Sequence, residues 1–215
     1  MKLLIDDKEY EMKRKYKISE FKKLLAFDIN VDINWRKLIG IAFDVPDKYL
    51  NYLSDDNIEL AISFIMVYLN EIKSDYINEN IINLDELKLS QYVDLDVYFS
   101  QGLHRSLEKV IEILYGVKED DYINEYWGGV LYYLSWRQTI IKSYKNLFDS
   151  DGEEEAEPQN INVAKKWYNT VLYLADDDIL KINNILELPL ISVFNFLAYK
   201  KEKSINELRK LNNKH

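Results

Sequence analysis

Residues 160–178 read NINVAKKWYNTVLYLADDD, and this stretch opens the clearest helical pattern in the chain. Its apolar residues recur every three or four positions, which is the period of a helix with one buried face. The three acids at its end precede a second apolar run, ILKINNILEL, and suit the N-terminus of a helix. Pro189 suits the first turn of a third helix. The sequence therefore predicts three helices between residues 160 and 211.

The predicted third helix changes character along its length. Its apolar stripe narrows after Tyr199, where KKEK at 200–203 is expected to face water. A narrowed stripe predicts an exposed amphipathic helix that can bind a partner. Aromatic residues concentrate both in cores and at interfaces, so those of the first helix are compatible with either role. The candidate protein-binding residues are Trp167, Tyr168, Phe194, Leu197, Ile205, Leu208 and Leu211.

An acidic stretch, DSDGEEEAEPQ at 149–159, precedes these helices. It contains Gly and Pro, and Ala156 is its only apolar residue. Such a composition is typical of a linker or a surface loop. It is either a flexible surface loop or the boundary between two lobes, and it separates an expected helical domain at 1–148 from an expected C-terminal helical lobe at 160–215.

The domain at 1–148 is expected to begin with a β-hairpin at 2–13. Leu3 and Ile5 alternate with polar neighbours, Asp6-Asp7-Lys8 supplies the turn, and Tyr10 and Met12 continue the alternation on the return strand. The open edge of a hairpin can recruit another chain, but capping a helical core is the more common role.

Helical segments are expected to follow the hairpin. Ser19 is predicted to cap the first of them, and later segments are expected near 34–45, 54–73, 96–115 and 121–148. The sequence YVDLDVYF at 92–99 alternates like a strand but runs into the fourth helical pattern, so we expect a loop or a short extended piece there before the helix begins near residue 96. The pair Gly128-Gly129 lies inside the last segment and predicts either a kink or a close approach of two helices.

Composition supports a helical protein. Apolar residues make up 47% of the 215 residues, and only 6 Gly and 3 Pro are present, which is too few for a turn-rich β protein. The predicted fold class is mainly α, a multi-helix globular bundle with a small N-terminal β-hairpin. Cysteine is absent, which fits a reducing cytosol. The apolar run at 58–69 is too short to span a bilayer, and Leu3 to Ile5 is too short for a signal peptide, so we expect a cytoplasmic protein without a membrane segment.

Charge is unevenly distributed. The net charge is −9, yet residues 1–23 and 195–215 are basic and the middle is strongly acidic. An acidic body repels phosphate backbones, so direct nucleic-acid binding is not expected. The basic ends could bind an acidic partner, although solvated helix faces are the ordinary explanation. The acidic middle leaves open an alternative function, in which the protein inhibits a host protein by imitating nucleic acid.

No residue pattern points to catalysis. His215 is the last residue, and His104 has no Cys or second His nearby, so a polar helix-surface histidine is expected. Asp94 and Asp96 have a spacing that metal ligands can have, but nothing else supports a metal site. We therefore expect no enzyme activity, no catalytic residue, no cofactor and no metal.

Both ends of the chain carry a resemblance. The order WYNTVLYLADDDILKINNILELPLISVFNFLAYKKEK resembles C-terminal segments of tail-assembly-chaperone-like and related morphogenesis proteins of tailed bacteriophages. These pair a Trp-bearing helix and an "LA-x-x-D-I-x-K" turn with a closing "fxxLxYxKxK" helix. The opening IDDKEYEMKRKYKISEFKKLL is similar to their usual start, and the centre of the chain is unmatched.

The resemblance implies a non-enzymatic role in phage assembly. Its expected partners are other phage structural proteins, and its expected location is the host cytoplasm, with incorporation into the virion as a structural or cargo component as the alternative. Homo-oligomer formation stays open.

Overall fold

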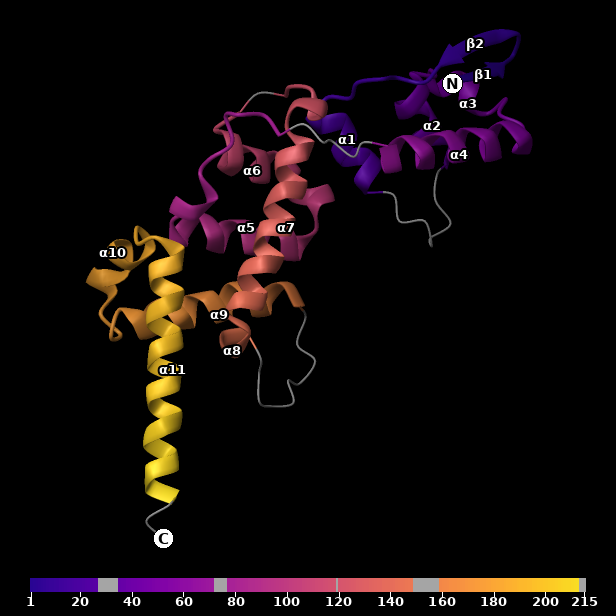
Figure 1. Ribbon diagram of the computed structural model, residues 1–215. Coiled ribbons are helices and arrows are strands. Elements are labelled where there is room, and N and C mark those ends of the chain that lie inside the picture. The colour runs from indigo at the N-terminus through magenta and orange to yellow at the C-terminus, as the bar shows by residue number, and fades with distance from the viewer. Residues whose placement is uncertain (27–34, 72–76, 119, 149–158, 213–215) are drawn as a thin grey trace. The chain divides into compact units, whose positions relative to one another are not determined.

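The computed structural model describes residues 1–26, 35–71, 77–118, 120–148 and 159–212, with the side chains of 69–71, 159–162, 211 and 212 outside the description. The described residues form eleven α-helices, three short 3-10 helices and one two-stranded hairpin (Figure 1). The predicted fold class, mainly α with a small N-terminal hairpin, is confirmed. Within the described ranges, every helix is too short or too polar to pass through a bilayer.

The N-terminal hairpin forms as predicted, but its turn is Asp6-Asp7 alone, because Lys8 already belongs to the second strand. Strand β1 (Lys2–Ile5) pairs antiparallel with β2 (Lys8–Glu11). Asp6 and Asp7 join the strands with φ angles of 50° and 59°, the left-handed conformation that a two-residue hairpin turn requires. Leu3 and Ile5 are buried while Leu4 is exposed. Since β1 packs against α4 (Asp55–Glu71), the hairpin covers part of a helical core.

The chain divides into two compact units, and each unit takes residues from two stretches. The first comprises Met1–Ile81 and Gly102–Leu131, and the second comprises Ile82–Gln101 and Tyr132–His215. This division differs from the expected boundary at 149–159 between a domain at 1–148 and a lobe at 160–215. The physical reason is that α9 (Gln159–Leu174) and α11 (Leu190–Asn212) both pack on α5 (Leu89–Gln101), so they share a core with it.

The first unit is built around α1 (Ile18–Leu25), which lies against α6 (Leu103–Tyr115). Two backbone hydrogen bonds hold the start of α1 in place: Ile18 N donates to Asp121 O at 2.8 Å, and Ile123 N donates to Tyr16 O at 2.9 Å. The Phe21 ring then meets the Trp127 ring edge-on, with 5.0 Å between centroids. The remaining elements that begin in this unit are α2 (Trp35–Phe43), α3 (Asp47–Leu50), η2 (Ile123–Glu125) and α7 (Trp127–Ser143).

In the second unit, the starts of α5 and α11 lie side by side. Leu89 N donates to Leu188 O at 2.9 Å, and Leu190 N donates to Leu87 O at 2.8 Å. These bonds fix the N-terminus of α11, directly after Pro189, as the sequence predicted. The other elements of this unit are η1 (Leu84–Glu86), α8 (Lys145–Phe148), η3 (Ile179–Lys181) and α10 (Ile182–Leu186).

Two of the expected helices have different bounds. The segment expected at 96–115 is two helices, α5 and α6, because Gly102 between them adopts a φ of 90° that a residue with a Cβ avoids. YVDLDVYF lies within α5 and is helical, not extended: Tyr92 and Leu95, three residues apart, are both fully buried on one helix face. The helix expected at 121–148 is divided into η2, α7 and α8.

Two further local predictions have clear outcomes in the first unit. Ser19 lies inside α1 and does not cap it; its backbone N and its hydroxyl donate to the Asp120 carboxylate, at 2.8 and 2.7 Å. The glycine pair does mark a close helix approach. A Cβ on Gly129 of α7 would stand 1.8 Å from the Tyr115 hydroxyl of α6.

Candidate protein-binding site

The core of the second unit is a cluster of aromatic rings contributed by three helices. Tyr92 of α5, Trp167 of α9 and Phe194 of α11 meet with ring centroids 5.6 to 6.3 Å apart. Tyr144 and Phe148 pack edge-on against Phe194, at 5.2 and 5.6 Å. Phe194 is 1% exposed and Trp167 is 9% exposed. The cluster therefore fixes how α9 and α11 lie on α5.

Asp96 of α5 ties this cluster to α7. Its carboxylate accepts a hydrogen bond from Trp167 Nε1 at 2.8 Å and one from Arg137 Nε at 3.0 Å, and it also pairs with Arg137 Nη2. Burial of the guanidinium opposes its charge, but the attraction of Asp96 outweighs that cost and raises the pKa of Arg137. A carboxylate engaged by three donors holds the three helices together and has a structural role here.

Two adjoining cavities lie beside the aromatic cluster, on the same side of α9 and α11. The first has a volume of about 460 Å³ and the second about 640 Å³. They share four lining residues, Leu147, Asn169, Thr170 and Leu197, and so form one continuous depression, which we call the α9–α11 groove. Trp167, Phe148 and Phe194 line its inner end, and Tyr173, Lys200, Lys201, Ser204 and Ile205 line its outer end.

The apolar face of α11 continues beyond the part that the second unit buries. Positions 190, 194, 197, 201, 205 and 208 lie on one face of the helix because they are spaced by three or four residues. Leu190 and Phe194 are 1% exposed, whereas Ile205 is 40% and Leu208 is 58% exposed. Figure 1 shows the C-terminal half of α11 extending past α8 and α9 of the same unit. This half offers an uncovered apolar stripe.

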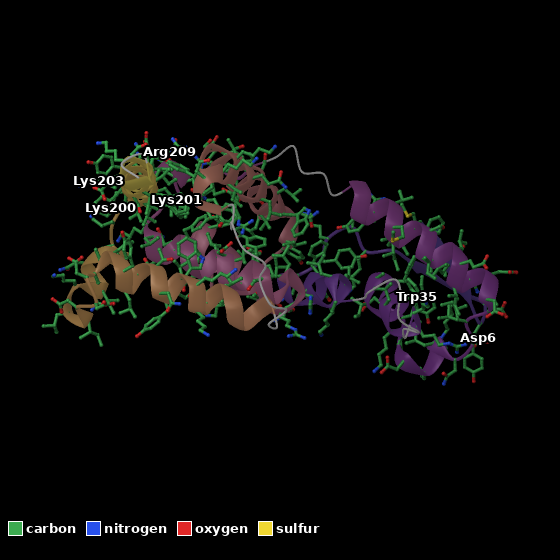
Figure 2. All side chains as sticks on the ribbon, turned by 90° about the horizontal axis from the view of Figure 1, so that it is seen from below. Asp6, Trp35, Lys200, Lys201, Lys203 and Arg209 are labelled. Atoms are coloured by element: carbon green, nitrogen blue, oxygen red, sulfur yellow. The ribbon has the colours of Figure 1, made fainter. Side chains whose placement is uncertain are left out.

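Basic side chains are distributed around the C-terminal half of α11. Figure 2 shows α11 almost end-on, with Lys200, Lys201, Lys203 and Arg209 around it. Lys201 Nζ donates a hydrogen bond to the carbonyl of Asn146 in α8, and this bond places the ammonium group of Lys201 at the edge of the groove. Glu202 and Glu207 are the acids between 199 and 210. This segment therefore carries a net positive charge in a chain whose net charge is −9.

The structure separates the sequence-predicted residues into three groups. Trp167 and Phe194 are buried and form the inner wall of the groove, and the half-buried Leu197 lines both of its cavities. Ile205 and Leu208 form the exposed stripe. Tyr168 is 57% exposed but does not line the groove, and Leu211 lies in α11 with its side chain outside the described residues.

Sequence reasoning missed the opposite wall of the groove. Asn169, Thr170 and Tyr173 of α9 line it, as does Leu147 of α8. The three α9 residues are spaced as one helix face, so projecting this helix would have grouped them. Nothing in the sequence placed Leu147 beside them, because that contact depends on how residues 132–148 fold back onto α11.

The residues considered for catalysis have other environments. The His104 ring lies against Gly102, where a Cβ would meet it at 2.8 Å. Asp176 and Asp177 form a turn at positive φ, and Asp178 accepts a hydrogen bond from Leu180 N at 3.0 Å, as the predicted cap would. Within the described ranges, no group of three or more His, Asp or Glu side chains is arranged so that it could hold a metal ion.

Comparison of the chain with protein-family models, with curated proteins and with solved structures gives no match. Function must therefore be inferred from the residues of this chain.

Proposed function

We propose that this protein acts by binding another protein, through the exposed half of α11 and the α9–α11 groove. The observation that carries the proposal is the continuity of one helix face. Leu190 and Phe194 of this face are buried, while Ile205 and Leu208 are about half exposed. Exposed apolar side chains at helical spacing are the feature by which amphipathic helices and grooves recognise each other.

The proposed partner is a structural protein of a tailed bacteriophage, and the proposed role is that of a tail-assembly-chaperone-like factor. Support comes from the resemblance of both chain ends to such proteins, including the Leu174–Lys181 turn and the Phe194–Lys203 helix segment. In this role the protein covers an amphipathic segment of its partner until that segment is built into the particle.

The physical character of the site suits reversible binding. Burying the remaining exposed surface of Ile205 and Leu208 contributes on the order of 2 kcal/mol, since full burial of such a side chain contributes roughly 1.5–3 kcal/mol. Such a contribution supports an interaction that can later be released, and it is small beside the apolar interfaces of permanent complexes.

Affinity capture from infected cells, followed by mass spectrometry, tests the proposal. The full-length protein is compared with the double variant Ile205→Ser/Leu208→Ser. The matched control is Ile179→Ser/Leu180→Ser, which removes two other exposed apolar side chains, 73% and 85% exposed, from the same unit. We expect the wild type and the control to recover a tail or capsid protein that the first variant loses.

Recovery of only a host nuclease or polymerase, with equal yield from all three proteins, would contradict the proposal. The stoichiometry of the protein in purified particles then separates a chaperone, which is absent or substoichiometric, from a structural or cargo component of the virion.

A further inference from the structure

The α9–α11 groove and its rim point to one class of partner: we infer that the site binds an acidic amphipathic helix. Apolar side chains of that helix occupy the groove and the stripe of Ile205 and Leu208, while its carboxylates face Lys200, Lys201 and Arg209. The inference rests on the proposed protein-binding function and specifies the chemistry of the partner.

The dimensions of the apolar surface fit a helix. Leu197, Ile205 and Leu208 share one face of α11, and the distance along the helix from 197 to 208 is about 16 Å at 1.5 Å per residue. Three turns of a partner helix cover the same length and present apolar residues at i, i+4, i+7 and i+11. The cavity of about 460 Å³ at the inner end, walled by Trp167 and Phe194, can accept one large side chain of such a helix.

The charge of the rim selects an acidic partner. Lys200 and Lys201 line the groove itself. Arg209 flanks the stripe further along α11, whereas Lys203 and Lys210 lie on the opposite face of the helix; Glu202 and Glu207 are the acids of this segment. Complementary charge at the rim of an apolar contact increases the association rate and rejects partners of like charge.

The same charge disfavours a second copy of this chain in the groove. In a two-fold symmetric pair the two α11 helices would contact each other through identical faces. The segment of α11 that carries Lys200 and Lys201 has a net positive charge, so two copies brought face to face repel each other overall.

A nucleic acid is a poorer occupant than a protein. Phosphates would be attracted by the lysines, but the apolar Ile205 and Leu208 lie between the basic residues and have nothing to bind on a phosphate backbone. The net charge of −9 also repels a polyanion that extends beyond the α11 tail.

Fluorescence anisotropy with a labelled synthetic peptide tests the inference. The probe is a helix-forming peptide of about 20 residues with Leu or Phe at i, i+4, i+7 and i+11 and Glu at the flanking positions. Two control peptides share its length: one has the same composition in scrambled order, and the other has Lys in place of every Glu. We expect the full-length protein to bind the probe at least about tenfold more tightly than either control peptide.

Four protein variants locate the binding surface. Lys200→Glu/Lys201→Glu and Ile205→Ser/Leu208→Ser should each weaken binding of the probe by about tenfold or more. Lys15→Glu/Lys23→Glu makes the same charge change at exposed lysines of the first unit, and Ile179→Ser/Leu180→Ser removes exposed apolar side chains elsewhere in the second unit. Both of these controls should bind like the wild type. Lys201 is half-buried and contacts Asn146, while the other substituted side chains are exposed; circular dichroism verifies that each variant keeps its helices.

Three results would overturn the inference. The acidic and basic peptides bind equally well, or all four variants bind the probe with equal affinity. The third is that a single-stranded DNA oligonucleotide displaces the probe and binds the Ile205→Ser/Leu208→Ser variant as tightly as the wild type. If these results appear while capture of a phage protein still depends on Ile205 and Leu208, the partner class is wrong and the proposed function stands. If that capture is also independent of Ile205 and Leu208, the proposed function fails.

Discussion

Asp96 is the residue whose loss should most damage the scaffold that supports the groove. Its side chain is 13% exposed and accepts hydrogen bonds from Arg137 of α7 and from Trp167 Nε1 of α9. Asp96→Ala leaves the guanidinium of Arg137 without its carboxylate and the indole N–H of Trp167 without its acceptor. Both donors remain partly buried after the substitution, so neither recovers full hydration.

The expected cost follows from these two losses. Removing one partner of a fully buried ion pair costs about 3–5 kcal/mol, but Arg137 is 29% exposed and water offsets part of that penalty. The orphaned indole N–H adds about 1 kcal/mol. We therefore expect Asp96→Ala to lower the free energy of unfolding of the second unit by about 3 kcal/mol. Asp96→Asn keeps an acceptor for Trp167 and should cost less.

Urea unfolding followed by circular dichroism measures this change, and the indole N–H signal of Trp167 in a ¹⁵N–¹H spectrum reports whether its hydrogen bond is lost. Asp85→Ala is the matched control, because Asp85 is an exposed aspartate of the same unit, and it should change stability by less than about 0.5 kcal/mol. If Asp96→Ala behaves like the control and the Trp167 signal does not shift, Asp96 does not hold α5, α7 and α9 together.

Three further predictions concern the packing and the acid–base properties of the described residues. Gly129→Ala should destabilise the first unit by about 2 kcal/mol, since the new Cβ overlaps the Tyr115 hydroxyl, and the cost measured by thermal unfolding should shrink in a Tyr115→Val background. The Tyr126 hydroxyl donates to Asp121 at 2.7 Å and lowers the pKa of that carboxyl, while burial, followed by this hydrogen bond, raises the pKa of Tyr126 to about 12. The stabilisation from Asp121 is present above the unfolded pKa of its carboxyl and is lost as pH falls through the lower folded pKa. The stabilisation from Tyr126 is lost as pH rises from about 10 to about 12. Tyr126→Phe should therefore make the free energy of unfolding depend less on pH in both ranges. Tyr133→Phe should raise the unfolding free energy by about 1 kcal/mol in urea titrations, because the buried Tyr133 hydroxyl has no hydrogen-bond partner among the described residues; a loss of 1 kcal/mol instead would reveal a partner.

The predictable part of the fold is the part that local patterns determine. The hairpin followed from the alternation around Leu3 and Ile5 and from two turn-forming aspartates, and the start of α11 followed from Pro189. Both features are encoded within a few neighbouring residues. The helical interpretation of residues 160–211 succeeded for the same reason, because periodicity reports a buried face without reference to what covers it.

The pairing of distant segments could not be predicted in this way. The stretch containing Tyr92 looked extended because its apolar residues alternate, yet burial against α9 and α11 favours the helix. The Asp96–Arg137–Trp167 contacts join residues that are 41 and 71 positions apart. Periodicity within one helix contains no information about such distances along the chain, so the second unit, made of 82–101 and 132–215, was not anticipated.

Part of the candidate site could also be predicted from the local sequence pattern. An amphipathic stripe that narrows after Tyr199 indicates an exposed helix end, so Ile205 and Leu208 could be chosen from sequence. Whether an aromatic side chain is buried or faces solvent depends on its neighbours in space. Trp167 is 9% exposed and Tyr168 is 57% exposed, although the two residues are adjacent in the chain.

Site-specific photo-crosslinking in infected cells tests the central proposal most directly. A photoreactive phenylalanine analogue replaces Leu208 on the exposed stripe or, as the control, Leu180, which is 85% exposed on η3. We predict that the analogue at 208 crosslinks to a phage structural protein, that the analogue at 180 does not, and that Lys200→Glu/Lys201→Glu reduces the crosslink at 208. Crosslinks of equal yield at both positions, or none at 208, would contradict binding through the exposed half of α11.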